Sequence, residues 1–127
     1  MAITFTHAIE NNLLLVSTSG FDGSVEDVAK YGMGVLGLCL ESGCLGILCD
    51  ERSLEYRVGV LDLHELAEYA AEVVPRTLAV AIVPNAAGIE DAMFYENVAV
   101  NRGIQVKAFT DVDQARHWLE MRTRAAG

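Results

Sequence analysis

The sequence predicts an α/β domain with a mostly parallel five-stranded sheet, an N-terminal β-hairpin and four main helices. Two observations lead to this fold class. After an opening pair of β-type runs, short apolar runs alternate with longer segments whose apolar residues recur at helical spacing. The runs "LGILC" and "TLAVAIVP" are continuous and rich in branched residues, which is typical of strands covered on both faces. Strands that alternate with helices imply right-handed crossovers and hence a largely parallel sheet.

The first half of the chain supplies the hairpin, one helix and one buried strand. The runs "ITFTH" and "NLLLVSTS", separated by "AIEN", predict the hairpin. Ser24 followed by Asp27 forms a capping-box pattern, and apolar residues at helical spacing then predict a helix over about 24–41. Gly43 ends this helix. The strand "LGILC" follows, and residues 50–61 are expected to form a charged loop.

The middle of the chain predicts a second helix and a second buried strand. Asp62 with Glu65 opens the helix, and we interpret Asp62 as its cap. The apolar residues of the helix lie on one stripe, and Pro75 ends it because proline lacks a backbone N–H. The run "TLAVAIVP" is then the next strand.

The last part of the chain predicts a helix, a strand and a closing helix. Residues 89–102 form the third helix, which ends at Gly103, and "IQVKAF" is the last strand. Thr110 with Asp113 makes a capping box before "DQARHWL". No linker or repeat divides this order, so we expect residues 1–127 to form a single domain.

The composition limits the classes of function. The chain has 127 residues, of which 52% are hydrophobic and 21% charged, which is typical of a folded domain with a real core. A formal net charge of −9 has the wrong sign for a face that binds nucleic acid. No apolar stretch has the length of about 20 residues that a membrane span needs. The opening "MAITFTHAIENN" has no signal-peptide pattern. We therefore expect a cytoplasmic protein without a membrane span that binds no nucleic acid.

The cysteines and histidines give no metal-binding pattern. Cys39, Cys44 and Cys49 fall on different expected elements, and no histidine lies near them in the sequence, as a zinc site would require. The three histidines are far apart in the sequence. We expect buried, reduced thiols, no metal site and no cofactor.

Four segments together are similar to a known family. They are "GILCDERSLEY", "VLDLHELAEY", "RTLAVAIVP" and "NVAVNRGIQVKAFTDVDQARHWL", and they span most of residues 45–119. On these segments the chain resembles the SpoIIAA-like proteins, whose fold is shared with STAS domains and is compared with CRAL-TRIO lipid-binding domains. The resemblance implies SpoIIAA-like β-α alternation and a regulatory or protein-interaction role. None of the four segments is a catalytic signature.

The resemblance also implies a position for a regulatory serine. In the anti-sigma-factor antagonists of the STAS group, a phosphorylatable serine in an Asp-Ser-Ser or Asp-Ser-Gly type of sequence stands where the helix after the third strand begins. Free N–H groups and the helix dipole favour phosphate there. Here that helix begins with "GVLDLHEL", and Asp62 stands where the serine is expected, so the usual motif is missing. Ser53 lies earlier, between two glutamates that would repel phosphate, and we interpret it as a solvated loop residue.

The best candidate site lies where the strands end. In open parallel sheets, ligands bind beyond the carboxyl ends of the strands, and loops there commonly carry function. The segment "DERSLEYR" is the richest of these ends. The same charges would also form a network of surface ion pairs without any function. The candidate residues for binding a ligand or partner are Asp50, Arg52, Ser53, Glu55, Tyr56, Arg57, Asn85 and Asp111.

The second half of the first helix, "YGMGVLGLCL", is apolar nearly all round, although each of its three glycines costs about 1 kcal/mol relative to alanine. Such a helix is expected to be covered on more than one face. Three interpretations stay open: close packing under neighbouring helices, a homodimer contact, and one wall of an apolar pocket. The residues that would form the dimer contact or pocket wall are Met33, Leu36, Gly37 and Leu40.

Two functions follow from these patterns. The first is a non-enzymatic regulatory or protein-interaction module, which forms a homodimer and binds a protein partner. The second is a small carrier or sensor for an apolar or anionic, lipid-like ligand, with Arg52, Tyr56 and Arg57 at the polar end. The second function requires an internal cavity beside residues 33–40. A hydrolase would need paired carboxylates with perturbed pKa values near "DERSLEYR".

Overall fold

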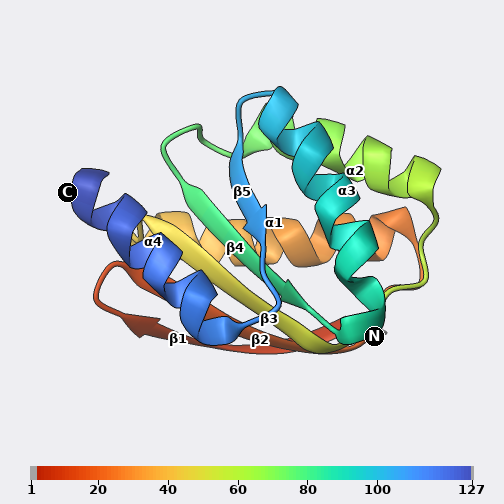
Figure 1. Ribbon diagram of the computed structural model, residues 1–127, viewed down its shortest axis with the longest axis horizontal. Helices are drawn as coiled ribbons and strands as arrows, with labels where there is room; N and C mark the ends of the chain where they lie inside the picture. The colour runs from red at the N-terminus through yellow and green to blue at the C-terminus, as the bar shows by residue number, and fades with distance from the viewer. Residues whose placement is uncertain (1–2, 127) are drawn as a thin grey trace.

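The computed structural model describes residues 3–126 and contains one five-stranded sheet with four α-helices (Figure 1). The strands are β1 (Ile3–Glu10), β2 (Leu13–Phe21), β3 (Gly46–Glu55), β4 (Ala79–Pro84) and β5 (Gln105–Ala108). The helices are α1 (Val25–Ser42), α2 (Val60–Val73), α3 (Ile89–Asn101) and α4 (Val112–Ala126), with a short 3-10 turn η1 (Ala86–Gly88) before α3. The predicted fold class and element order are confirmed.

The sheet has the strand order β1-β2-β3-β4-β5. β1 is antiparallel to β2, and each later strand is parallel to the one before it. Because each parallel strand is added on the same side, right-handed crossovers place α1, α2 and α3 on one face of the sheet. α4 follows the last strand and covers the other face, so that in Figure 1 it crosses in front of the sheet while α1 runs behind it.

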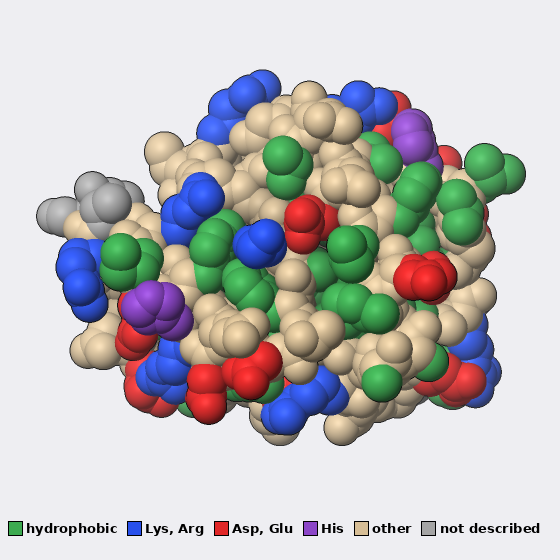
Figure 2. Space-filling view, viewed as in Figure 1, with side chains coloured by type: hydrophobic (Ala, Val, Ile, Leu, Met, Phe, Trp, Pro, Cys, Tyr) green, Lys and Arg blue, Asp and Glu red, His purple; other side chains and the backbone are tan. Residues whose placement is uncertain are grey.

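Two buried layers hold the helices to the sheet. On the α4 face, Leu13, Leu48 and Val83 pack against Leu119, which is fully buried. On the other face, α1 packs against β2 and β3, while α2 and α3 meet over β5. No helix within residues 3–126 combines the length and apolar character needed to cross a membrane. Figure 2 shows hydrophobic side chains grouped near the middle of one face, with most charged side chains near the outline.

The sequence signals at the two ends of α1 are confirmed. The backbone N–H of Asp27 donates a hydrogen bond to Ser24 Oγ at 3.1 Å. Gly43 directly follows the helix with a φ of 73°, a left-handed conformation that favours glycine. In the single chain, part of the apolar surface of α1 is exposed: Met33 is 44% exposed and Leu40 57% exposed. The expected cover on more than one face stays a prediction, because a homodimer contact would supply it.

Two predicted helix caps are also wrong. The N-cap of α2 is Gly59, so the helix begins earlier than expected and Asp62 lies inside its first turn. Its negative charge still suits the positive end of the helix dipole there. At α4, the preceding residue is Asp111 rather than Thr110, and Asp111 Oδ1 accepts a hydrogen bond from Gln114 N at 3.0 Å.

The largest difference from the expected fold is the length of β3. The sequence predicts a loop over residues 50–61, but β3 continues to Glu55. β4 pairs with β3 only as far as Glu51, whereas β2 pairs with it as far as Glu55. The last residues of β3 therefore have a neighbouring strand on one side only, and their polar sequence reflects this partial exposure.

A β-bulge interrupts the pairing of β2 with β3. Ser17 pairs with Asp50 and Ser19 with Ser53, so β3 has one residue more than β2 in this stretch. An extra residue reverses which side chains face each side of the sheet. The residues of this segment that face the interior under α1 and α2 are thus Ile47 and Cys49 before the bulge, Glu51 within it, Leu54 after it and Tyr56 just beyond the strand.

Candidate functional site

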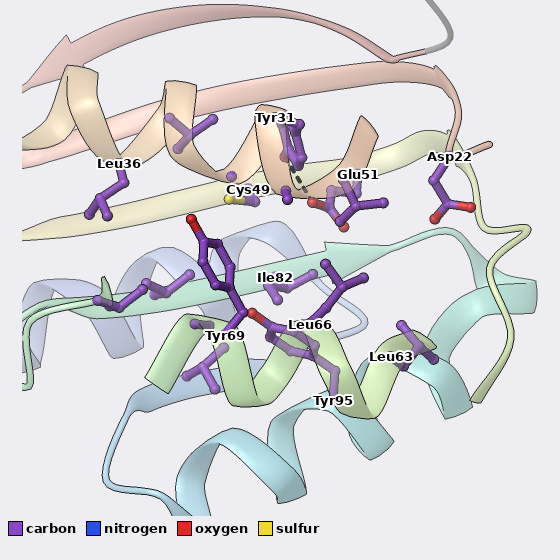
Figure 3. Close-up of a pocket in the computed structure, with 18 of the residues that line it drawn as sticks. Asp22, Tyr31, Leu36, Cys49, Glu51, Leu63, Leu66, Tyr69, Ile82 and Tyr95 are labelled. Atoms are coloured by element: carbon purple, nitrogen blue, oxygen red, sulfur yellow. Dashed lines mark hydrogen bonds between the residues drawn. The ribbon is translucent and has the colours of Figure 1, made fainter. Parts of the chain in front are cut away.

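A cavity of about 190 Å³ lies between the sheet and helices α1, α2 and α3 (Figure 3). Native cores rarely leave voids much larger than a water molecule, and an engineered apolar cavity of about 150 Å³ in another protein binds benzene. The apolar side chains that line the cavity include Val28, Val35, Leu36, Ile47, Leu63, Leu66, Ala70, Val73, Val80, Ile82 and Val106. The cavity therefore has the size and lining for a small apolar molecule.

The cavity reaches the protein surface between α1 and α2. Met33 on α1 and Tyr69 on α2 both line the cavity, and they are 44% and 38% exposed. Gly32 lines the same opening, and a Cβ atom added to it would meet nothing within 4 Å. A ligand would enter through this gap between the two helices.

A hydrogen-bonded cluster around Glu51 forms the polar end of the cavity. Glu51 is only 8% exposed, and the hydroxyl of Tyr31 donates to its Oε2 at 2.8 Å. The hydroxyl of Tyr56 donates to Oε1. Because the hydroxyl hydrogen of Tyr31 is used in the bond to Glu51, the Thr18 hydroxyl is the donor to Tyr31 Oη at 2.9 Å. Residues from β2, α1, β3 and the segment after β3 thus form one hydrogen-bonded cluster around the carboxyl group of Glu51.

Burial shifts the ionisation of this cluster. It raises the pKa of Glu51 above its ordinary value, hydrogen bonds from Tyr56 and Tyr31 oppose the shift, and the charges of Asp22 and Asp50 add to it. Burial also raises the pKa of Tyr31 and of Tyr56, so both phenols are neutral donors at neutral pH.

Asp22 lies at the same end and fixes the segment that follows β3. Asp22 is 4% exposed, and its Oδ1 accepts hydrogen bonds from the backbone N–H groups of Arg57 and, at 3.0 Å, of Val58. Burial raises the pKa of Asp22, while these two hydrogen bonds oppose the shift. The contact holds the connection to α2 against the end of β2.

The polar side chains that line the cavity are acidic or neutral. The acids are Asp22, Glu51 and Asp91, and within residues 3–126 no lysine, arginine or histidine is among the lining residues. The described part of the chain also contains no cluster of three His, Cys, Asp or Glu residues suited to a metal ion. Cys49 lines the cavity as a free thiol, and burial raises its pKa.

The structure divides the candidate residues on "DERSLEYR" into two groups. Tyr56 lines the cavity, but Arg52 pairs with Asp50 at 2.8 Å and Arg57 pairs with Glu55 at 2.8 Å, both outside it. The guanidinium of Arg52 holds the pKa of Asp50 below its usual value. The bulge explains the division, because it directs Tyr56 inward and its charged neighbours outward.

The remaining candidate residues have separate positions. Ser53 is exposed on β3, and Asn85 Nδ2 donates to the backbone carbonyl of Leu54 at 2.6 Å. Within residues 3–126, Asn85 Oδ1 is buried without a hydrogen-bond partner. Asp111 accepts the hydrogen bond at the start of α4. Of the four α1 residues, Met33 and Leu36 line the cavity, whereas Gly37 and Leu40 lie outside its lining.

Sequence reasoning missed most of the polar end. Tyr31 precedes Val35 by four residues, so it lies on the buried face of α1. Glu51 continues the alternation of Ile47 and Cys49, which would have placed it inside had β3 been extended. Tyr69, Tyr95 and Asp22 come together only through the tertiary fold, and no local pattern signals them.

No family model matches the sequence, and no curated protein matches it. The structure is similar to the crystal structure of an anti-sigma factor antagonist from Mycobacterium paratuberculosis, with a TM-score of 0.66. The match covers 93% of this chain and 94% of that chain at 13% sequence identity, so the likeness is one of fold. This chain therefore has the α/β fold of an anti-sigma factor antagonist of SpoIIAA/STAS type, the fold that its sequence resemblance implied.

Proposed function

We propose that this chain is a non-enzymatic regulatory module of SpoIIAA/STAS type that senses a small apolar ligand in its central cavity. The observation that carries the proposal is the cavity, which the sheet and three helices enclose and which opens between α1 and α2. Most of the lining is apolar, so an apolar molecule gains free energy by leaving water for this cavity.

The residues that line the opening can transmit the effect of ligand binding to the protein surface. Met33 and Tyr69 touch both the cavity and solvent, so a ligand that moves them alters the surface formed by α1 and α2. In the proposed mechanism, ligand binding selects one arrangement of this surface and thereby changes its affinity for a partner. In this proposal the ligand takes the role that the resemblance assigns to a phosphorylated serine in anti-sigma-factor antagonists, and Asp62 stands where that serine is expected.

A protein partner is supported by the likeness of fold. The Mycobacterium paratuberculosis protein of the same fold is an anti-sigma factor antagonist. We infer that this chain also acts through a protein partner, and that α1 makes a homodimer contact, which is one of the three interpretations of its apolar sequence. Without a partner, the same cavity would serve a simple carrier, and that is the second candidate function.

Native mass spectrometry of the purified protein is the first test, because it reads assembly state and bound mass together. The second test uses ethylbenzene, a probe of about the right size, and two matched variants. Gly32→Leu places a side chain at the opening, whereas Gly37→Leu changes the same helix outside the lining. Both positions have room for a Cβ atom, and both variants gain helix propensity.

We expect ethylbenzene to raise the thermal unfolding midpoint of the wild type and of Gly37→Leu by a few degrees. Gly32→Leu should lose most of this shift because its side chain closes the opening. If ethylbenzene shifts neither the wild type nor Gly37→Leu, and no bound mass is found, the ligand-sensing proposal is wrong. A co-purified mass without any change in partner binding would favour the carrier.

A further inference from the structure

We propose that the ligand of the central cavity is an apolar amine, whose ammonium group pairs with Glu51 while its hydrocarbon part fills the apolar end. The inference rests on the proposed function, because it names the class of ligand for the same cavity. The sequence alone suggests an apolar or anionic ligand, with Arg52, Tyr56 and Arg57 at the polar end. Three features of the cavity favour a cation instead.

The first feature is the sign of the charge at the polar end. Asp22, Glu51 and Asp91 line the cavity, and no basic side chain within residues 3–126 lines it with them. The two arginines expected at this end, Arg52 and Arg57, turn to carboxylates outside the cavity. A ligand carboxylate would lose its hydration and find no cation to replace it, which makes it the least favoured head group.

The second feature is the set of partners around Glu51. Buried carboxylates in proteins are usually paired with a cation. The side chains of Tyr31 and Tyr56 each donate one hydrogen bond to Glu51, but both are neutral. An ammonium group supplies the missing positive charge and three N–H donors, and the phenol oxygens keep lone pairs that can accept from it.

The third feature is the aromatic lining. The chain has four tyrosines, and all four line this cavity: Tyr31, Tyr56, Tyr69 and Tyr95. Figure 3 shows Tyr31 entering from α1 and Tyr69 and Tyr95 from the opposite side. The faces of aromatic rings attract cations, and the attraction grows when the cation is desolvated. Acidic and aromatic groups thus converge on one small cavity whose remaining lining is apolar.

The size of the cavity limits the ligand to about one ring with a short arm. Its volume of about 190 Å³ is somewhat larger than that of the engineered cavity that accepts benzene. Phenethylamine has this size, and 2-phenylethanol, phenylacetate and ethylbenzene differ from it mainly in the head group. These four molecules separate the contribution of the head group from that of the hydrocarbon.

The experiment is isothermal titration of the wild-type protein with each of the four probes at neutral pH. We expect phenethylamine to bind about tenfold or more tightly than 2-phenylethanol, because hydrogen bonds between charged groups are the stronger ones. Phenylacetate should bind most weakly. Gly32→Leu should weaken binding of all four probes if they occupy this cavity.

Two variants of glutamates on β3 test whether Glu51 pairs with the ammonium group. Glu51→Gln should weaken phenethylamine about tenfold while changing 2-phenylethanol less than about threefold. Glu55→Gln is the matched control, because Glu55 is exposed and pairs with Arg57 outside the cavity. If Glu51→Gln fails to fold, Tyr56→Phe can replace it, because this variant removes one hydrogen-bond donor to Glu51. The ranking of the four probes by their affinity for the wild-type protein needs no variant.

Each outcome decides between the two proposals. If the alcohol or phenylacetate binds as tightly as the amine, the amine inference is wrong and the ligand-sensing function stands. If none of the four probes binds, the ligand-sensing function is wrong and the amine inference falls with it. An amine preference that survives Glu51→Gln would also overturn the role given to Glu51.

Discussion

Glu51 is the residue on which most of the cavity chemistry depends. It lies at the bulge of β3, and its two oxygens accept hydrogen bonds from phenols that belong to different elements. A carboxyl group in this position is more stable protonated than it would be in water, because burial disfavours its charged form. Its ionisation therefore affects both ligand affinity and the stability of the fold.

The first prediction concerns the pH dependence of stability. The pKa of Glu51 in the folded protein lies above its ordinary value of 4.5, so the folded state keeps this proton to higher pH than the unfolded chain does. Its stabilising contribution is fully present below about pH 4.5 and is lost as the pH rises through the folded pKa. Glu51→Gln cannot titrate. We measure the free energy of unfolding of both proteins by urea unfolding across this pH range. The value for Glu51→Gln minus the value for the wild type should increase as the pH rises.

Other carboxyl groups titrate in both proteins and largely cancel in this difference. The raised pKa of Asp22 acts in the same direction as that of Glu51. The lowered pKa of Asp50 acts in the opposite direction, since its contribution is lost as the pH falls below its ordinary value of 3.8. A difference between variant and wild type that stays constant with pH would show that Glu51 has no shifted pKa.

The second prediction concerns Gly88, at the start of α3. A Cβ atom there would lie 2.6 Å from Cδ2 and 2.8 Å from Cε2 of the Tyr56 ring. The ring cannot move away without straining its hydrogen bond to Glu51. We expect Gly88→Ala to lower the free energy of unfolding by about 1–3 kcal/mol, measured by urea unfolding.

A double-mutant cycle tests this explanation. In a Tyr56→Ala background the clash is removed, so Gly88→Ala should cost much less than in the wild type. An equal cost in both backgrounds would assign the effect to the backbone of Gly88 instead of its contact with Tyr56. Gly37→Ala is a useful reference, because its Cβ has open space and alanine stabilises a helix interior by about 1 kcal/mol.

At the scale of elements, one buried side chain, Asp22, fixes the start of the connection from β3 to α2. Asp22 Oδ1 accepts hydrogen bonds from two consecutive backbone N–H groups, those of Arg57 and Val58. Asp22→Ala leaves both donors without this acceptor and should lower the free energy of unfolding by about 1–3 kcal/mol. Asp22→Asn keeps an acceptor oxygen and should cost clearly less. Equal losses in urea unfolding would mean that the charge of Asp22, and not the acceptor, matters.

The elements also show which parts of the fold a sequence can predict. The strands "LGILC" and "TLAVAIVP" and the helices with one apolar stripe follow from periodicity, because burial imposes that periodicity. The second half of β3 cannot be predicted as a strand, because β4 does not extend beside it and its residues are therefore polar. The bulge cannot be predicted either, because an extra residue in one strand is defined only by its pairing with the neighbouring strand.

At the scale of the whole molecule, the candidate site was predicted in part. The α1 side chains Met33 and Leu36, and Tyr56 after β3, do line the cavity. The expected arginines do not. Arg52 faces away from the interior because it follows the inward-facing Glu51, and beyond the bulge Tyr56 faces inward while Arg57 lies outside. Most of the polar end consists of residues separated in sequence, which only the packing of α1, α2 and α3 against the sheet brings together.

The fourth prediction concerns assembly. If α1 mediates a homodimer, Leu40→Glu should convert it to a monomer, because a charge would replace a 57% exposed apolar side chain at the contact. Val100→Glu makes the same kind of change on α3, where 48% of the side chain is exposed, and should leave the dimer intact. Sedimentation velocity measures the assembly state of both variants and of the wild type. A monomeric wild type would overturn the homodimer proposal.

The placement of α4 has a consequence for how the protein is made. Each strand from β2 onward pairs with the strand that was synthesised before it, so sheet, α1, α2 and α3 can form while the chain is still growing. The opposite face of the sheet, which contains Leu13, Leu48 and Val83, is covered only after α4, a helix of 15 residues, has been made. Until α4 has been made and has docked on the sheet, these apolar side chains stay exposed, and we expect a chaperone that recognises apolar surface to bind the chain at this stage.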